Sequence, residues 1–219
     1  MARDAMHRVS TVNYGDKIWL FAGAIIHCAF KTIFTIYLTV SMEDKFKNKY
    51  RIPSARWAAW DYGQQAAYFI TICTAHRQHY FGHISNKQMI LSDIGKIAEE
   101  EWFKTPSIRP DMNLCLEDFV VMPNHIHGIL TIGENEYNQS AIVKTAEFGP
   151  QSKNLSSILR GYKSAITTQA RKTHIDFGWQ ERFHDHVIRN HEEFQRIAYY
   201  IIHNPENWEK DCFFQPPTP

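Results

Sequence analysis

The clearest pattern in the chain is a largely apolar stretch from Val120 to Ile132 that is interrupted by two histidines. Its β-branched and aliphatic residues are typical of a buried strand. Successive side chains of a strand point to opposite faces, so His125 and His127 share one face while Ile126 and Leu130 share the other. The pattern therefore predicts a strand with two imidazoles side by side.

A second pattern lies near the C-terminus, where apolar residues recur at helical spacing between Glu193 and Trp208. At about 100° per residue they form one stripe of a helix, made of Phe194, Ile197, Ile201 and Trp208. The same count turns Tyr200 and Asn204 inward with the stripe and Tyr199 toward solvent. A phenol and an amide are thus predicted to face the core together.

The remaining periodicities complete the order of elements. We expect a strand at 67–74, a helix that Ser92 caps and that ends before Pro106, a strand at 114–122 and a tight turn at Pro123-Asn124 before the histidine strand. After a loop at 133–149 come an amphipathic helix at 153–172, a strand at 179–190 and the final helix. This order predicts an α+β fold, an antiparallel sheet with helices mainly on one face.

Composition places the chain among ordinary globular proteins, with 219 residues, 44% of them apolar. Lysine and arginine number 24 against 23 acidic residues, so the chain lacks the overall positive field of many duplex-DNA binders. The four cysteines are widely separated and show no Cys-x-x-Cys spacing, which argues against a zinc knuckle and fits a reducing cytoplasm.

Residues 1–41 differ in character from the rest of the chain, and we assign them to an N-terminal extension, with 42–219 as the main domain. The 23 residues of segment 18–40 are close to the length that spans a bilayer. Lys31 lies near its middle, and no small-residue cleavage site is evident, so we do not expect a membrane anchor. Met42 is an alternative start of the protein.

Two imidazoles on one face make half of a metal site. An isolated His-x-His is more often unligated, with one ring capped by a backbone carbonyl. The helix that brings Tyr200 and Asn204 toward His125 and His127 favours a metal site, in which the amide oxygen of Asn204 completes the protein ligands. His186, on the next strand, is a further possible ligand, but we expect its ring to be capped by the backbone.

Positive charge collects in one segment. Between 153 and 172 there are five cations and no carboxylate, and this amphipathic helix could bind phosphates, although a solvated face is the simpler alternative. The candidate DNA-binding residues are Lys153, Arg160, Lys163, Arg171 and Lys172, together with Arg189. The basic and aromatic arm at 42–63 could grip single-stranded nucleic acid or cover the sheet edge, and both interpretations stay open.

Five short motifs succeed one another in an order that resembles the HUH single-tyrosine transposases, and within them the REP-associated tyrosine transposases. The resemblance covers about residues 50–208. The motifs are Trp60-Asp61-Tyr62, Tyr68-Phe69-Ile70-Thr71, Met122-Pro123-Asn124-His125-Ile126-His127-Gly128, Trp179-Gln180 with His186-Val187-Ile188-Arg189-Asn190, and Tyr200-Ile201-Ile202-His203-Asn204-Pro205.

This resemblance implies a ferredoxin-like HUH core and a metal-dependent endonuclease and strand transferase. Its partner would be single-stranded DNA with hairpin-flanked repeats, and it needs no small-molecule cofactor. Tyr200 would be the nucleophile and form a 5′-phosphotyrosine. A site of His125, His127 and Asn204 suits Mn²⁺ at least as well as Mg²⁺. A hairpin-binding protein of the same fold that does not cut is the alternative, and whether the protein acts as a homodimer stays open.

Overall fold

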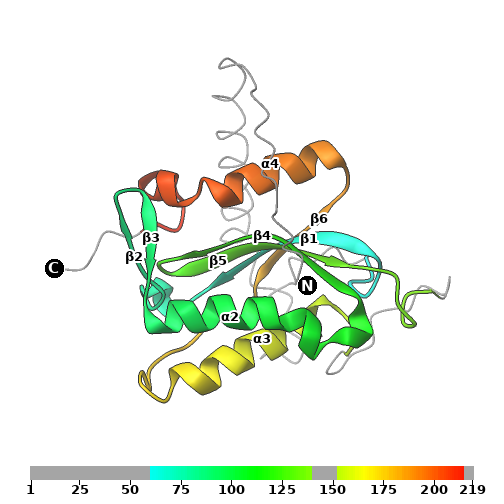
Figure 1. Ribbon diagram of the computed structural model, residues 1–219, viewed down its shortest axis with the longest axis horizontal. Coiled ribbons are helices and arrows are strands. Elements are labelled where there is room, and N and C mark those ends of the chain that lie inside the picture. The colour runs from blue at the N-terminus through cyan, green and yellow to red at the C-terminus, as the bar shows by residue number, and fades with distance from the viewer. Residues whose placement is uncertain (1–59, 140–151, 215–219) are drawn as a thin grey trace, which may run out of the picture. The chain divides into compact units, whose positions relative to one another are not determined.

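A four-stranded antiparallel sheet forms the centre of the fold (Figure 1). The computed structural model describes residues 60–139 and 152–214; the predicted extension, the apolar segment 18–40 and most of the arm at 42–63 lie outside these residues. The sheet consists of β1 (Ala66–Cys73), β4 (Leu114–Met122), β5 (His125–Ile132) and β6 (His184–Ile188), in the order β4-β5-β1-β6.

Three longer helices cover the two faces of this sheet. They are α2 (Asp93–Ile108), α3 (Leu155–Ala170) and α4 (His191–Ile202). Figure 1 shows α2 and α3 on one face and α4 on the other. Helix α2 connects β1 to β4 and α3 connects β5 to β6, each crossing over a strand that lies between. Two interleaved βαβ units of this kind define the ferredoxin-like topology, so the predicted fold class is confirmed.

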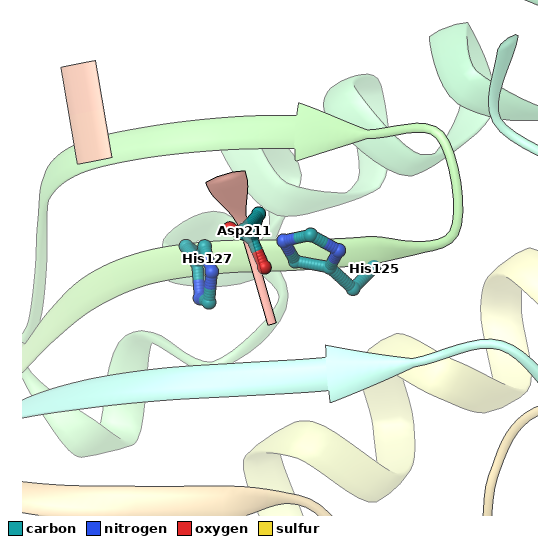
Figure 2. A group of neighbouring side chains, drawn as sticks. All are labelled: His125, His127 and Asp211. Carbon is teal, nitrogen blue, oxygen red and sulfur yellow. The ribbon is translucent and has the colours of Figure 1, made fainter. Parts of the chain in front are cut away.

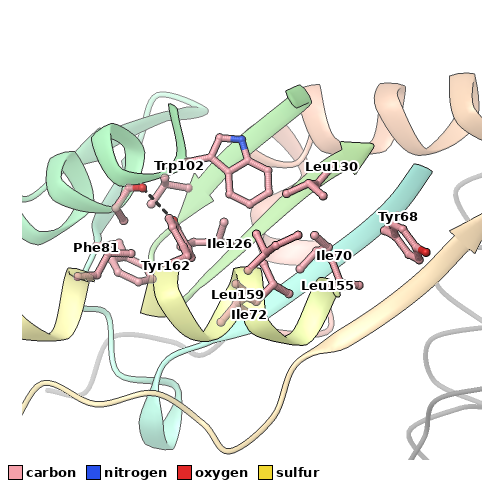
Figure 3. Packing of buried hydrophobic residues seen from close by; sticks show 14 of the residues in the cluster. Tyr68, Ile70, Ile72, Phe81, Trp102, Ile126, Leu130, Leu155, Leu159 and Tyr162 are labelled. Atoms are coloured by element: carbon pink, nitrogen blue, oxygen red, sulfur yellow. Dashed lines mark hydrogen bonds between the residues drawn. The ribbon is translucent and has the colours of Figure 1, made fainter. Parts of the chain in front are cut away.

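The main hydrophobic core lies between the sheet and helices α2 and α3 (Figure 3). Alternate residues of β1 and β5 point into it, among them Ile70, Ile72 and Ile126, which are at most 1% exposed. Tyr162 of α3 donates its hydroxyl to the carbonyl of Ala98 in α2 at 2.8 Å and so ties the two helices together. The other alternate residues of β5, including both histidines, therefore face α4.

The helix boundaries agree with local signals, with one exception. Ser92 caps α2 as expected, because its hydroxyl accepts from the backbone N–H of Gly95 at 3.1 Å. The predicted end before Pro106 is wrong, since α2 continues to Ile108. Proline in the last turn removes only one hydrogen-bond donor, and the buried Trp102 one turn earlier anchors the helix from which that turn extends.

Other elements were not anticipated or are shorter than expected. Strands β2 (Gly82–Ser85) and β3 (Gln88–Leu91) form a separate hairpin whose turn has positive φ at Asn86 and Lys87. The strand predicted at 179–190 is confined to β6, preceded by a single bridge between Trp179 and Thr74. Short 3₁₀ helices occur as η1 (Ala75–Arg77), η2 (Pro110–Met112) and η3 (Pro205–Lys210). Among the described residues, no helix has the length and apolar character needed to cross a membrane.

A glycine in β5 allows α2 to approach the sheet directly behind the histidines. A Cβ added to Gly128 would lie 2.7 Å from the ring of Trp102 and 3.1 Å from that of Phe119. These two rings are stacked at 4.7 Å and cannot both retreat. We predict that Gly128→Ala lowers the free energy of unfolding by about 1–3 kcal/mol in urea denaturation.

The matched control is Gly161→Ala in α3, where an added Cβ meets nothing within 4 Å. Replacing an exposed helical glycine by alanine should raise the free energy of unfolding by up to about 1 kcal/mol. Equal stability of the Gly128→Ala variant and the wild type would show that the Trp102–Phe119 pair is loosely packed.

Candidate metal and nucleophile site

Strand β5 presents both histidines on the face that lies beneath α4. The rings of His125 and His127 are 4.5 Å apart, and both side chains are fully buried. Figure 2 shows the two imidazoles along one strand with the carboxylate of Asp211 beside them. The predicted side-by-side arrangement of the histidines on one face is therefore present in the fold.

Neighbouring polar groups hold each imidazole in one orientation. His125 Nδ1 lies 2.9 Å from Oδ1 of Asn124, whose Nδ2 donates to the carbonyl of Phe213. Because the amide oxygen only accepts, His125 carries its proton on Nδ1 and presents a bare lone pair on Nε2. Nδ1 of His127 lies 2.9 Å from the hydroxyl of Thr71. Outer contacts of this kind are typical of metal-binding histidines.

Tyr200 reaches the histidine pair from α4, as the helical count predicted. Its hydroxyl lies 3.1 Å from Nε2 of His127 and 3.3 Å from Oδ2 of Asp211, to which it donates. Its ring also meets Phe69 edge-on at 6.2 Å. Tyr199 points the other way and is 48% exposed.

Asp211 is a site residue that sequence reasoning missed. It lies just after η3, eleven positions beyond Tyr200, and no periodicity links the two. Its Oδ2 accepts from Nδ2 of Asn204 at 2.9 Å, and its Oδ1 accepts from the backbone N–H of Phe213 at 2.7 Å. One carboxylate thus joins the end of α4 to the segment at 211–213.

The donor set fits a divalent cation. Ligand atoms of His125, His127 and Asp211 lie within 4.8 Å of one another, and opposed ligands around one ion are about 4 Å apart. Nε2 of His125 and Oδ1 of Asn204 are buried and accept no hydrogen bond. A buried acceptor without a donor costs about 1–3 kcal/mol, and a cation coordinated by both atoms would remove that cost.

Burial sets the ionisation of these groups. It lowers the pKa of both histidines well below the usual 6.5, and the charge of Arg77 adds to the effect on His125. Both imidazoles are therefore neutral at pH 7, the form that binds metals. Burial, then the Asp211 carboxylate, raises the pKa of Tyr200 well above 10, so the phenol keeps its proton.

Aromatic side chains from the last described segment cover the site. The ring of Phe213 lies 4.6 Å from that of His125 and 5.9 Å from that of His127, and Trp208 lies 5.9 Å from His125 on another side. Arg77 of η1 places its guanidinium carbon 4.4 Å from the centre of the Phe213 ring. In this conformation the imidazoles are closed off from solvent.

The predicted basic residues between 153 and 172 lie away from this site, because α3 packs on the opposite face of the sheet, whereas Arg189 lies between β6 and α4. Several also have partners within the chain. Lys153 pairs with Asp111, Lys163 donates to the carbonyls of Gln180 and Arg182, and Arg171 donates to that of Phe177. Arg160, Lys172 and Arg189 are exposed. The cations thus do not gather into one surface around the histidines.

His186 is not capped by the backbone, contrary to expectation. Its Nε2 lies 2.8 Å from Oε1 of Glu193 in the first turn of α4, and this pair is partly exposed. The carboxylate of Glu193 also accepts from the backbone N–H of Arg189. The carboxylate of Glu193 is therefore the partner of the His186 ring, in place of the predicted backbone carbonyl.

Fold and site together define a ferredoxin-like α+β protein with a paired-histidine site and a tyrosine beside it. A protein of Haemophilus influenzae, itself described as uncharacterized, is 36% identical over 168 residues, which cover 74% of this chain and 92% of the relative. The chain belongs to the same family as that protein. No family model matches it.

Two solved structures are also similar. One is a REP-associated tyrosine transposase bound to a REP hairpin, with 20% identity, 72% of this chain and 74% of that chain covered, and a TM-score of 0.49. The other is a candidate transposase of Deinococcus radiodurans, with 16% identity, 70% and 98% coverage, and a TM-score of 0.36.

The lowered pKa values predict how stability depends on pH in the metal-free protein. In the unfolded chain a histidine has a pKa near 6.5, so below about pH 6.5 unfolding takes up protons that buried His125 and His127 exclude. The free energy of unfolding should fall as the pH drops from 7.5 to 5, by up to about 1.4 kcal/mol per pH unit for each histidine.

Urea denaturation in EDTA measures this slope. His125→Gln should reduce the slope of the free energy of unfolding against pH by the contribution of one histidine. His83→Gln, at an exposed position of β2, should leave the slope unchanged. A wild-type stability that stays constant between pH 7.5 and 5 would mean that the buried imidazoles accept protons without unfolding.

Proposed function

We propose that this protein is a metal-dependent single-stranded DNA endonuclease and strand transferase that forms a 5′-phosphotyrosine through Tyr200. The observation that carries the proposal is the convergence of a tyrosine hydroxyl, two neutral imidazoles and a carboxylate from three separate parts of the chain. The motif order that resembles the HUH transposases adds single-stranded DNA with hairpins as the substrate class.

The reaction requires a nucleophile and an acceptor for its proton. Tyr200 Oη forms a bond to phosphorus, the bond from phosphorus to the 3′ oxygen breaks, and this oxygen takes a proton from water and leaves as a 3′-hydroxyl. The phenolic proton has an acceptor in place, since Oδ2 of Asp211 already accepts the hydrogen bond of Tyr200. Reversal with another 3′-hydroxyl joins strands, so no ATP is needed.

A bound divalent cation would withdraw charge from the scissile phosphate and orient it toward the tyrosine. His125 and His127 supply nitrogen ligands, and Asn204 and Asp211 supply oxygen. Two imidazoles favour Mn²⁺ over Mg²⁺, which prefers oxygen ligands. The unpaired Nε2 of His125 and Oδ1 of Asn204 support this choice of ligands.

The substrate needs access that the closed conformation does not offer. Both imidazoles are 0% exposed beneath the ring of Phe213. The ring of Phe213 must therefore move aside, while Asp211 stays in the site, before a phosphodiester can contact them. The exposed Arg160 of α3 and Lys172, which follows this helix, would contact DNA on the far side of the sheet from the histidines.

A covalent adduct is the direct test of this function. Wild-type protein incubated with a single-stranded oligonucleotide carrying a hairpin, in Mn²⁺, should give a protein–DNA adduct that survives denaturing electrophoresis. Tyr200→Phe should abolish the adduct, because phenylalanine has no oxygen to attack phosphorus.

Tyr199→Phe is the matched control, since this neighbouring tyrosine is 48% exposed and turned away from the histidines. Loss of the adduct in Tyr199→Phe but not in Tyr200→Phe would show that the nucleophile lies on the other face of α4. Binding of the hairpin with no adduct under any divalent cation would instead favour the alternative, a hairpin-binding protein that does not cut.

Metal binding can be tested without DNA. Titration calorimetry with Mn²⁺ should show one site per chain, and Asp211→Asn should weaken it at least tenfold, because an amide replaces a carboxylate among the ligands. Glu209→Gln removes a carboxylate from the same segment at an exposed position and should bind Mn²⁺ like the wild type. If Asp211→Asn binds Mn²⁺ with unchanged affinity, the carboxylate serves only to hold Tyr200 and Asn204.

A further inference from the structure

The loop after β1 brings a cation to the histidine site that no motif indicated. Arg77 lies in η1, and its guanidinium packs over the face of Phe213 at 4.4 Å. The same ring contacts His125 at 4.6 Å between centroids. One aromatic ring therefore separates the guanidinium from an imidazole of the site, and the positive charge of Arg77 contributes to the lowered pKa of His125.

The backbone fixes this loop beside the histidine strand. Thr74 donates from both its N–H and its hydroxyl to the carbonyl of Asn124, the residue before His125, at 3.0 Å each. The N–H of Ala75 donates to the carbonyl of Gly178 at 2.9 Å. The bonds from Thr74 thus hold the start of this loop beside Asn124, at the start of the histidine strand.

The loop also keeps a conformation that side chains avoid. His76 and Arg77 both have positive φ, 52° and 55°, although neither is glycine. Each such residue costs on the order of 1 kcal/mol, and such strain collects at functional sites. The conformation directs the Arg77 side chain toward Phe213.

We propose that Arg77 binds a phosphate of the single-stranded DNA next to the one that Tyr200 attacks. This inference rests on the proposed function for its substrate. Phe213 must leave the histidines before DNA can enter, and the same movement takes the ring away from the guanidinium. The planar fork of arginine then faces the space that the phosphodiester backbone occupies, and it suits two phosphate oxygens at once.

The salt dependence of binding tests this contact separately from cutting. The dissociation constant of a fluorescent single-stranded oligonucleotide is measured by anisotropy in EDTA at several salt concentrations. Arg77→Gln should weaken binding about tenfold, and it should reduce the slope of log affinity against log salt by about 0.7, the value for one lost phosphate contact on single-stranded DNA. Arg77→Lys, which keeps the charge, should retain the slope.

Arg109→Gln is the matched control, because Arg109 lies just after α2 and pairs with Asp111. The slope of log affinity against log salt for Arg109→Gln should equal that of the wild type. An unchanged slope in Arg77→Gln overturns the inference, and it does so even where the wild type forms the covalent adduct. A reduced slope without any adduct supports the contact while the proposed cutting activity fails.

If Arg77→Gln does not fold, labelling of the wild type with phenylglyoxal decides instead. Protection of Arg77 by the oligonucleotide, read by mass spectrometry, supports the phosphate contact. Equal labelling of Arg77 with and without oligonucleotide overturns it.

Discussion

The burial of two neutral imidazoles on one face of β5 is the constraint on which the rest of the site depends. An imidazole placed in an apolar interior must satisfy its polar atoms or lose about 1–3 kcal/mol for each one left unpaired. Asn124 and Thr71 satisfy one nitrogen of each ring and in doing so direct the other nitrogen toward a common point. The contacts that make the histidines tolerable in the interior are therefore the same contacts that orient them for a ligand.

Much of this arrangement could be predicted because it is local. Alternation along β5 puts His125 and His127 on one face whatever the rest of the fold does, and the 3.6-residue period of α4 separates Tyr200 from Tyr199. The order of the strands and helices around the sheet was predicted from the same spacing of apolar residues along the chain. The tight turn before the histidine strand agrees with the two-residue link between Met122 and His125.

The site residues that were not predicted lie in segments where apolar residues do not recur at a regular spacing. Asp211 and Phe213 reach the histidines only because the chain turns back after Pro205 through η3, and nothing in the spacing of residues encodes that return. Arg77 reaches them through two left-handed residues, which propensities do not anticipate for histidine and arginine. A count of charges on α3 does not show where each side chain lies, since a long lysine such as Lys163 can bend back onto main-chain carbonyls.

The contact between Tyr200 and His127 has a consequence for the order of events in the proposed reaction. In the closed conformation the hydroxyl of Tyr200 donates to Asp211 and lies 3.1 Å from Nε2 of His127, so this nitrogen carries the ring proton and donates to the phenol oxygen. A cation bound by His127 would need Nε2 without its proton and would displace the hydroxyl, which would keep Asp211 as its acceptor. In the proposed reaction, binding of a cation to the histidines and release of the tyrosine hydroxyl would thus be coupled. A buried phenol with a raised pKa, held beside an imidazole, would stay unreactive until a cation binds. The residues proposed to assemble the site would then also keep it inert without a cation.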